Sequence, residues 1–153
     1  MHDSKGNTIV AGKERTFSYP YPDSLYIIKY SQQGKRLWKK KYGSRKSLSS
    51  LCVDNNDYIF ISISQCDDCR LTDGSTQKGT VLVKFDPQGN ILWEKRGVIL
   101  PPAFNPDNTV FVTVGFVDSV LMPPNILLKT NQPDYSFAIG KMNADGEFEW
   151  ALA

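Results

Sequence analysis

The sequence has one histidine, three cysteines and no long apolar run, and each of these shortages excludes a class of function. A single histidine, His2, makes a Ser-His-Asp or Cys-His catalytic arrangement improbable. Three cysteines are a low and odd count, which does not build a disulfide framework. No apolar stretch approaches the roughly 20 residues needed to span a bilayer, so no membrane span is predicted. The chain also has no glycine-rich phosphate loop, and we predict no cofactor.

The formal net charge is only +2, which gives no overall bias toward nucleic acid or membrane surfaces. The cations are nevertheless unevenly placed, because the segment from Ser24 to Val53 contains no acidic residue. Most of its cations form one basic run: Lys35, Arg36, Lys39, Lys40, Lys41, Arg45 and Lys46. This run could bind an anionic polysaccharide, a nucleic acid or a charged surface. We favour the alternative that it keeps an edge strand from pairing with other chains, because no nucleic-acid motif accompanies it.

What the sequence does have is an internal repeat. The pattern K-x-x-x-x-G-x-x-x-W occurs three times, and its tryptophans are the only three in the chain, at steps of 55 and 57 residues (38 to 93 and 93 to 150). The repeated positions are Lys29, Gly34, Trp38, Lys84, Gly89, Trp93, Lys141, Gly146 and Trp150. A weaker element, a turn-forming pair followed by strand-forming residues, precedes each lysine and aligns Asn7, Asp57 and Asn108. Such self-similarity is the signature of a repeat architecture.

Each unit is predicted to contain four strands. In the second unit these are Ser50–Val53, Tyr58–Ser64, Thr80–Phe85 and Ile91–Lys95, and the turn Asp86–Gly89 joins the last two. The third strands are apolar on both faces, as in Val81-Leu82-Val83, which is expected when a small sheet is packed between two neighbours. We therefore predict an all-β, propeller-like array of about three four-stranded antiparallel blades in a single repeat region. Its units are residues 1–46, 47–98 and 99–153, and the first lacks its inner strand.

The connections between the second and third strands differ in length and composition. They span residues 12–24, 65–79 and 118–134. Variable loops on a repeated scaffold are where binding specificity usually lies.

The segments G-N-x-I-V-x-G and K-x-D-x-x-G-x-x-x-W resemble the β-propeller repeat of many bacterial secreted and surface proteins, a family that is usually seven-bladed. The third unit departs from it, since Asn143 replaces the usual Asp and Pro101-Pro102 interrupts the expected inner strand. The resemblance implies a propeller fold, a location outside the cell or on its surface, and no common catalytic residues. Because propellers typically need four or more blades to close, we expect a fragment of a longer chain or a ring closed by two copies.

The repeated residues have a structural and a functional interpretation. The tryptophans could stack on sugars or bases, but their recurrence in register favours packing. The repeated lysines could form an anion-binding ring; we expect instead that their stems cover apolar surface while the ammonium groups reach water. Cys66 and Cys69 have the spacing of half a zinc site, but further ligands are lacking nearby, so we predict no metal. A disulfide between these two and a pair of free thiols both remain open.

Taken together, the sequence favours a non-catalytic binding or structural module that presents its loops to a protein or a glycan. The alternative is a piece of a propeller enzyme, quinoprotein-like or polysaccharide-active, whose catalytic groups lie partly in other blades. The partners expected are further blades of the same chain or a second copy of it. A nucleic-acid partner is not expected.

Overall fold

The chain folds into three antiparallel sheets of three or four strands and two small hairpins. The computed structural model describes residues 1–14, 24–44, 47–64, 69–70, 76–77, 80–96, 102–105, 107, 109–116, 119–122, 125–129 and 136–153. Every regular element within these ranges is a β-strand, so the prediction of an all-β fold is confirmed.

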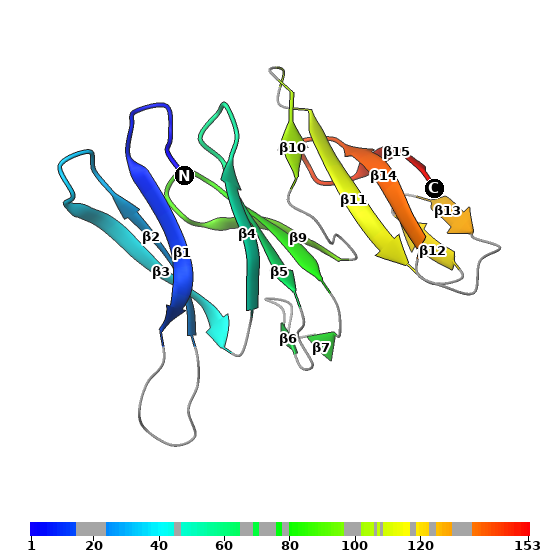
Figure 1. Cartoon of the computed structure of the whole chain (residues 1–153), viewed down its shortest axis with the longest axis horizontal. Coiled ribbons are helices and arrows are strands. Elements are labelled where there is room, and N and C mark those ends of the chain that lie inside the picture. The colour runs from blue at the N-terminus through cyan, green and yellow to red at the C-terminus, as the bar shows by residue number, and fades with distance from the viewer. Residues whose placement is uncertain are drawn as a thin grey trace.

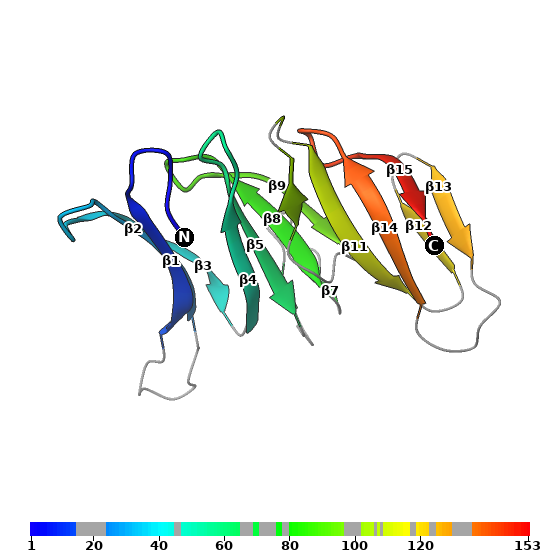
Figure 2. The same ribbon diagram turned by 45° about the horizontal axis from the view of Figure 1, so that its top comes forward.

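The three sheets follow one another along the chain, and in each the strands pair in chain order. The first sheet consists of β1 (Thr8–Glu14), β2 (Ser24–Tyr30) and β3 (Arg36–Ser44). The middle sheet consists of β4 (Ser47–Val53), β5 (Ile59–Ser64), β8 (Val81–Phe85) and β9 (Ile91–Arg96). The last sheet consists of β10 (Ala103–Phe104), β11 (Val110–Phe116), β14 (Ser136–Met142) and β15 (Phe148–Leu152). They stand side by side in this order (Figures 1 and 2).

Two of the segments expected to be loops contain hairpins of their own. β6 (Cys69–Arg70) pairs with β7 (Thr76–Gln77) between β5 and β8 of the middle sheet. β12 (Ser119–Met122) pairs with β13 (Ile126–Lys129) between β11 and β14 of the last sheet. β13 also packs near β15, so this second hairpin lies against the last sheet (Figure 1).

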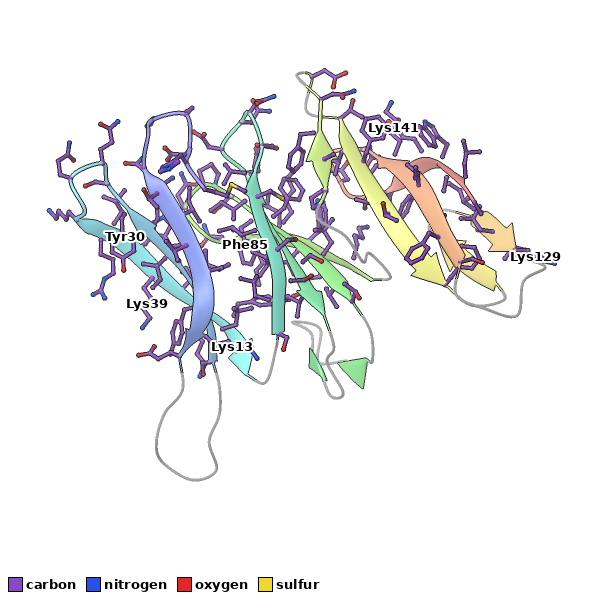
Figure 3. The ribbon with its side chains drawn as sticks, viewed as in Figure 1. Lys13, Tyr30, Lys39, Phe85, Lys129 and Lys141 are labelled. Carbon is purple, nitrogen blue, oxygen red and sulfur yellow. The ribbon has the colours of Figure 1, made fainter. Side chains whose placement is uncertain are left out.

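The middle sheet is covered by the first sheet on one face and by the last sheet on the other. Successive side chains of a strand point to opposite faces, so its strands contribute to both cores. The core shared with the first sheet contains Ile9, Leu25, Ile27, Tyr42, Ile59, Ile61, Ile63, Val81, Val83 and Phe85. The core shared with the last sheet contains Phe60, Leu82, Val110, Val112, Val114, Met142 and Phe148. All five residues of β8 are buried, which explains why this strand is apolar without alternation. Figure 3 shows the side chains that fill the spaces between the sheets.

The tight turns that precede β1, β5 and β11, which we call the opening turns, repeat at equal steps of 51 residues (3 to 54 and 54 to 105). In each turn a backbone N–H bonds the carbonyl oxygen four residues later, and the first residues are Asp3, Asp54 and Asn105. The predicted register is one residue wrong in the first unit. The counterpart of Asp57 (φ 66°) is Gly6 (φ 71°), not Asn7, because both occupy the left-handed position of the turn.

The first unit keeps the end of an inner strand. The backbone N–H of Ile9 bonds the carbonyl oxygen of Met1 at 2.9 Å, and His2 forms a bridge with Thr8. In the last sheet, β10 pairs with the start of β11 in the equivalent place. In the first unit, residues 1–2 therefore pair with β1 in the position where we expected no inner strand.

Candidate functional site

The repeated lysine and tryptophan of one sheet hold the glycine turn of the next sheet. Lys29 Nζ donates to the carbonyl oxygen of Pro87 at 3.3 Å, and Lys84 Nζ donates to that of Ala144 at 3.1 Å. Pro87 and Ala144 each lie two residues before the turn glycine of their unit. The indole N–H of Trp93 donates to the same Ala144 oxygen at 3.0 Å. The contact of the lysine with the turn carbonyl occurs at both interfaces, and we call the lysine, the tryptophan and the glycine turn that they contact the clasp.

The turn glycines of the clasp lie directly against the tryptophans. A Cβ atom added to Gly89 would lie 3.1 Å from a ring carbon of Trp38, and one added to Gly146 would lie 2.8 Å from a ring carbon of Trp93. Both glycines also have positive φ, 80° and 75°, so glycine is required for the turn and for the close approach.

The clasp lysines are buried, and our expectation that their ammonium groups reach water is wrong. Lys29 is 7% and Lys84 is 6% exposed. Lys29 Nζ also forms an ion pair with Asp3 at 2.8 Å, and Lys84 Nζ lies 4.4 Å from the centre of the Tyr58 ring. A buried ammonium must be paired or hydrogen-bonded, and the carbonyl oxygens of the next sheet provide that partner.

The electrostatics of the two clasps differ. Burial alone would raise the pKa of Asp3, but hydrogen bonds from Lys29 and Asn7 outweigh burial and lower this pKa to about 2. Burial lowers the pKa of Lys84, and Asp54 and Asp145 oppose this shift. Burial raises the pKa of Asp54, although backbone N–H groups of its own turn oppose it.

Further contacts join the sheets around the clasp. The Tyr42 hydroxyl donates to Glu94 of the middle sheet, and the Tyr42 ring lies edge-on to Phe85 with centroids 5.7 Å apart. At the turn end, the backbone N–H of Ser4 donates to Asp57 at 2.6 Å and the Ser4 hydroxyl donates to it at 2.7 Å. The first interface is therefore both apolar and specifically hydrogen-bonded.

The third copy of the motif presents the same groups on an outer face. Trp150 is 39% exposed and its ring lies 6.1 Å from that of Phe111, while Lys141 pairs with Glu149 at 2.6 Å. At the other end of the array, a Cβ atom added to Gly34 would meet no atom within 4 Å. The last sheet thus offers a lysine and a tryptophan, and the first sheet offers an open glycine turn.

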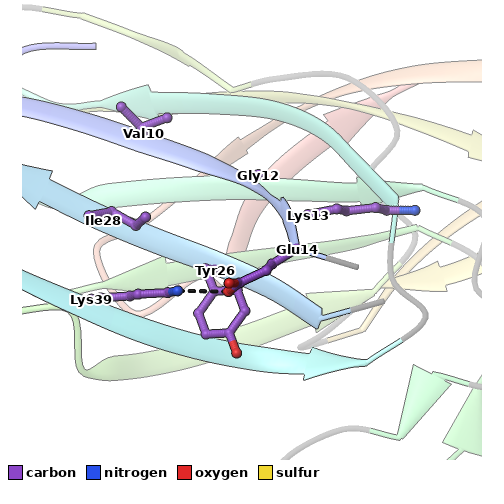
Figure 4. A pocket seen from close by; sticks show the side chains of 7 residues that line it. All are labelled: Val10, Gly12, Lys13, Glu14, Tyr26, Ile28 and Lys39. Atoms are coloured by element: carbon purple, nitrogen blue, oxygen red, sulfur yellow. Dashed lines mark hydrogen bonds and ion pairs between the residues drawn. The ribbon is translucent and has the colours of Figure 1, made fainter. Parts of the chain in front are cut away.

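A hollow of about 270 Å³ marks the outer face of the first sheet (Figure 4). Val10, Gly12, Tyr26 and Ile28 form its apolar wall. Lys39 lies at its rim, 4.0 Å from the centre of the Tyr26 ring. This lysine also pairs with Glu14 at 2.7 Å, so its charge is neutralised locally.

The basic run does not form one surface. Lys39 lies opposite Ile28 and Lys41 opposite Tyr26, which places both on the outer face of the first sheet. Lys40 points the other way and donates to Asn90 of the middle sheet at 3.4 Å. Lys35 and Arg36 are exposed at the turn, and Arg45 and Lys46 lie outside the described residues. The alternation of β3 therefore divides the predicted patch between two faces.

The cysteine predictions fall largely outside the described residues. Cys66 lies there, and of Cys69 only the backbone in β6 is described. Cys52 is a free thiol whose sulfur lies 3.8 Å from the carbonyl oxygen of Phe60. Burial raises its pKa to about 12, which makes it a poor nucleophile. Among the described residues no cluster of metal-ligating side chains occurs.

Two sets of turn residues form side-chain hydrogen bonds that the sequence analysis did not predict, although it placed Asp86 and Asn143 in the repeated motif. Side-chain oxygens of Ser31, Asp86 and Asn143 accept backbone N–H groups within the glycine turns. Asp3 and Asp54 do the same in the turns that open the units. For the glycine turns a sequence signal was available, because a Ser, Asp or Asn stands two residues after each repeated lysine. Side chains of these residue types commonly accept backbone N–H groups within a turn.

No protein-family model matches the chain, and no curated protein matches its sequence. No helix in the described part of the chain is long and apolar enough to cross a bilayer.

Proposed function

We propose that this chain is a non-catalytic binding module, an arc of propeller blades whose inter-strand loops present the interaction surface. The observation that carries the proposal is the clasp, found at both internal interfaces with the same residues in the same places. Such a repeated face-to-face contact is the packing expected of neighbouring blades. The likeness of the repeat to that of bacterial secreted and surface proteins supports a location outside the cell.

The strand arrangement supports a division between a scaffold and a recognition edge. The clasps and tight turns lie at one end of the strands, while β1, β5 and β11 end at the opposite edge (Figure 1). The predicted variable connections, residues 12–24, 65–79 and 118–134, include or closely follow the ends of these strands, at residues 14, 64 and 116. A scaffold rigidified by buried contacts, with variable loops along one edge, is the usual design of a binding protein.

The partner proposed is a protein or a glycan. Glycan arrays and surface-coupled candidate proteins would be screened with the intact chain, and products would be assayed for turnover. The matched variant replaces residues 15–23, which include Phe17, Tyr19 and Tyr21, with a glycine–serine segment of the same length. We expect binding without turnover in the intact chain, and weaker binding with an unchanged melting temperature in the variant. Turnover of a bound glycan would overturn the proposal.

A further inference from the structure

The outer face of the last sheet exposes residues whose equivalents are buried in the interior. Phe137 and Ile139 are each 57% exposed. Counted from the repeated lysine, they correspond to Leu25 and Ile27 of the first sheet, which are 0% exposed because the middle sheet covers them. The last sheet therefore exposes side chains whose equivalents the chain buries between its sheets elsewhere.

The outer face of the first sheet is the complementary surface. Val10, Tyr26 and Ile28, which line the hollow in Figure 4, correspond to Ile61, Val81 and Val83 of the middle sheet. In the middle sheet these positions are buried in the core shared with Leu25 and Ile27 of the first sheet. The hollow of about 270 Å³ is therefore the place where side chains equivalent to Leu25 and Ile27 would pack.

The polar parts of a clasp are present at the two ends as well. Lys141 and Trp150 correspond to Lys84 and Trp93, whose nitrogen atoms donate to the Ala144 oxygen. The counterpart of Ala144 in the first unit is Gln32, two residues before Gly34. Because the surface beside Gly34 is open, the indole and ammonium of another molecule can approach it as Trp93 approaches Gly146.

We propose that the two outer faces bind each other, so that a second copy of this chain docks head to tail, its first sheet on the last sheet of its neighbour. In this contact Phe137 and Ile139 of one copy fill the hollow on the first sheet of the other. Lys141 breaks its ion pair with Glu149, and Lys141 and Trp150 then donate to the Gln32 carbonyl oxygen of the other copy. The interface is heterologous, because different faces of the two molecules meet. Two copies satisfy both pairs of faces when they close into a ring of six sheets.

The first test is the mass of the chain in solution. Light scattering coupled to gel filtration is expected to show a dimer of the 17.2-kDa chain. Ile139→Lys on the last sheet and Ile28→Lys on the first are each expected to give a monomer, since either change blocks one side of every contact. Phe137→Lys and Val10→Lys serve as second variants at the same two faces. Leu92→Lys is the matched control: Leu92 is 50% exposed but lies on the middle sheet, so the dimer should persist.

The second test is a mixture, which identifies the heterologous geometry. Ile139→Lys retains an intact first-sheet face and Ile28→Lys retains an intact last-sheet face. The two monomers mixed are expected to form a one-to-one dimer through a single contact. Melting curves would establish that each variant is folded. A wild-type chain that is monomeric at all concentrations, a blocked variant that still dimerises, or a mixture that stays monomeric would each overturn the proposal.

The docking is separate from ligand recognition by the loops. It rests on the faces of the end sheets, whereas the proposed binding function rests on the opposite edge of the strands. A monomer that still binds a glycan or protein would refute the docking alone. A dimer that degrades its ligand would refute the binding-module proposal alone.

Discussion

At the scale of single residues, the clasp depends on charges that have been removed from water. Lys29 is held between a carboxylate of its own sheet, Asp3, and a carbonyl oxygen of the next sheet. Removing one member of such a buried pair destabilises the fold by more than the intact pair stabilises it, because the remaining charge is left uncompensated.

The ion pair of Asp3 predicts a specific acid sensitivity. Its pKa is lowered in the folded protein from 3.8 to about 2, so it stabilises the fold above about pH 4, and this contribution is lost as the pH falls toward 2. The shift corresponds to about 2 kcal/mol at neutral pH. Asp3→Asn should lower the free energy of unfolding at pH 7 by about this amount and flatten its decline between pH 4 and pH 2. Denaturant unfolding across this pH range measures both effects.

Glu149→Gln is the matched control for that measurement. Its ion pair with Lys141 is exposed, with side chains 32% and 44% accessible, and exposed pairs contribute little. We expect a change of less than about 0.5 kcal/mol. Equal losses in the two variants would contradict the role assigned to the buried pair.

At the scale of elements, the glycine turn is the part of each sheet that the preceding sheet recognises. Gly34, Gly89 and Gly146 have nearly the same φ, 78°, 80° and 75°, but only the last two contact a tryptophan. The three turns can therefore be compared directly, since all three need a residue with positive φ but only two of them have a tryptophan ring beside the glycine.

Alanine at the three turn glycines should destabilise the chain unequally. Gly34→Ala incurs only the strain of positive φ, about 1–2 kcal/mol. Gly89→Ala and Gly146→Ala add a clash, because the new Cβ would lie 3.1 Å and 2.8 Å from the ring of Trp38 or Trp93. We expect the loss of unfolding free energy to increase from Gly34 to Gly89 to Gly146. Equal losses would mean that the tryptophans yield freely and do not hold the turns.

The tryptophans provide a second comparison between elements. Trp93 packs on the core of the second interface and lies edge-on to Phe60, with centroids 5.8 Å apart, whereas Trp150 faces outward. Trp93→Ala should lower the free energy of unfolding by about 3 kcal/mol, and Trp150→Ala by less than about 1 kcal/mol in the monomeric state. Both are measured by thermal or denaturant unfolding at low protein concentration. A larger loss at Trp150 would contradict the assignment of the two faces.

Local sequence chemistry predicted the strands well and the polar contacts between the sheets poorly. Asp86-Pro87-Gln88-Gly89 determines a turn by itself, so the strands on either side of it could be placed from the sequence. The partner of Lys29, in contrast, is a backbone carbonyl 58 residues away, and a carbonyl has no sequence signature. The sequence run of cations does not give their faces for a related reason, because neighbouring residues such as Lys39 and Lys40 point to opposite faces of β3, which is an edge strand as expected.

At the scale of the whole molecule, stability should be greatest in the middle of the array. In repeat architectures each unit is stabilised mainly by its contacts with adjacent units. The middle sheet has two such neighbours, and each end sheet has one within the chain.

Amide hydrogen exchange should reveal this gradient. β2, β8 and β14 are matched, since each is hydrogen-bonded to a strand on both sides, but only β8 belongs to a sheet covered on both faces. At concentrations where the chain is monomeric, the amides of β8 should therefore exchange more slowly than those of β2 and β14. If head-to-tail docking occurs, protection of β2 and β14 should rise with protein concentration while that of β8 changes little. Uniform protection of the three strands in the monomer would contradict the stacked arrangement.

The constant step of 51 residues between opening turns has an evolutionary consequence. Residues 54–104 run from one opening turn to the next and include the turn and clasp residues of the middle sheet. A duplicated gene segment encoding them would add a sheet whose two faces already recognise its new neighbours. Proteins of this kind can therefore gain or lose whole 51-residue units through recombination, without the prior evolution of a new contact between sheets.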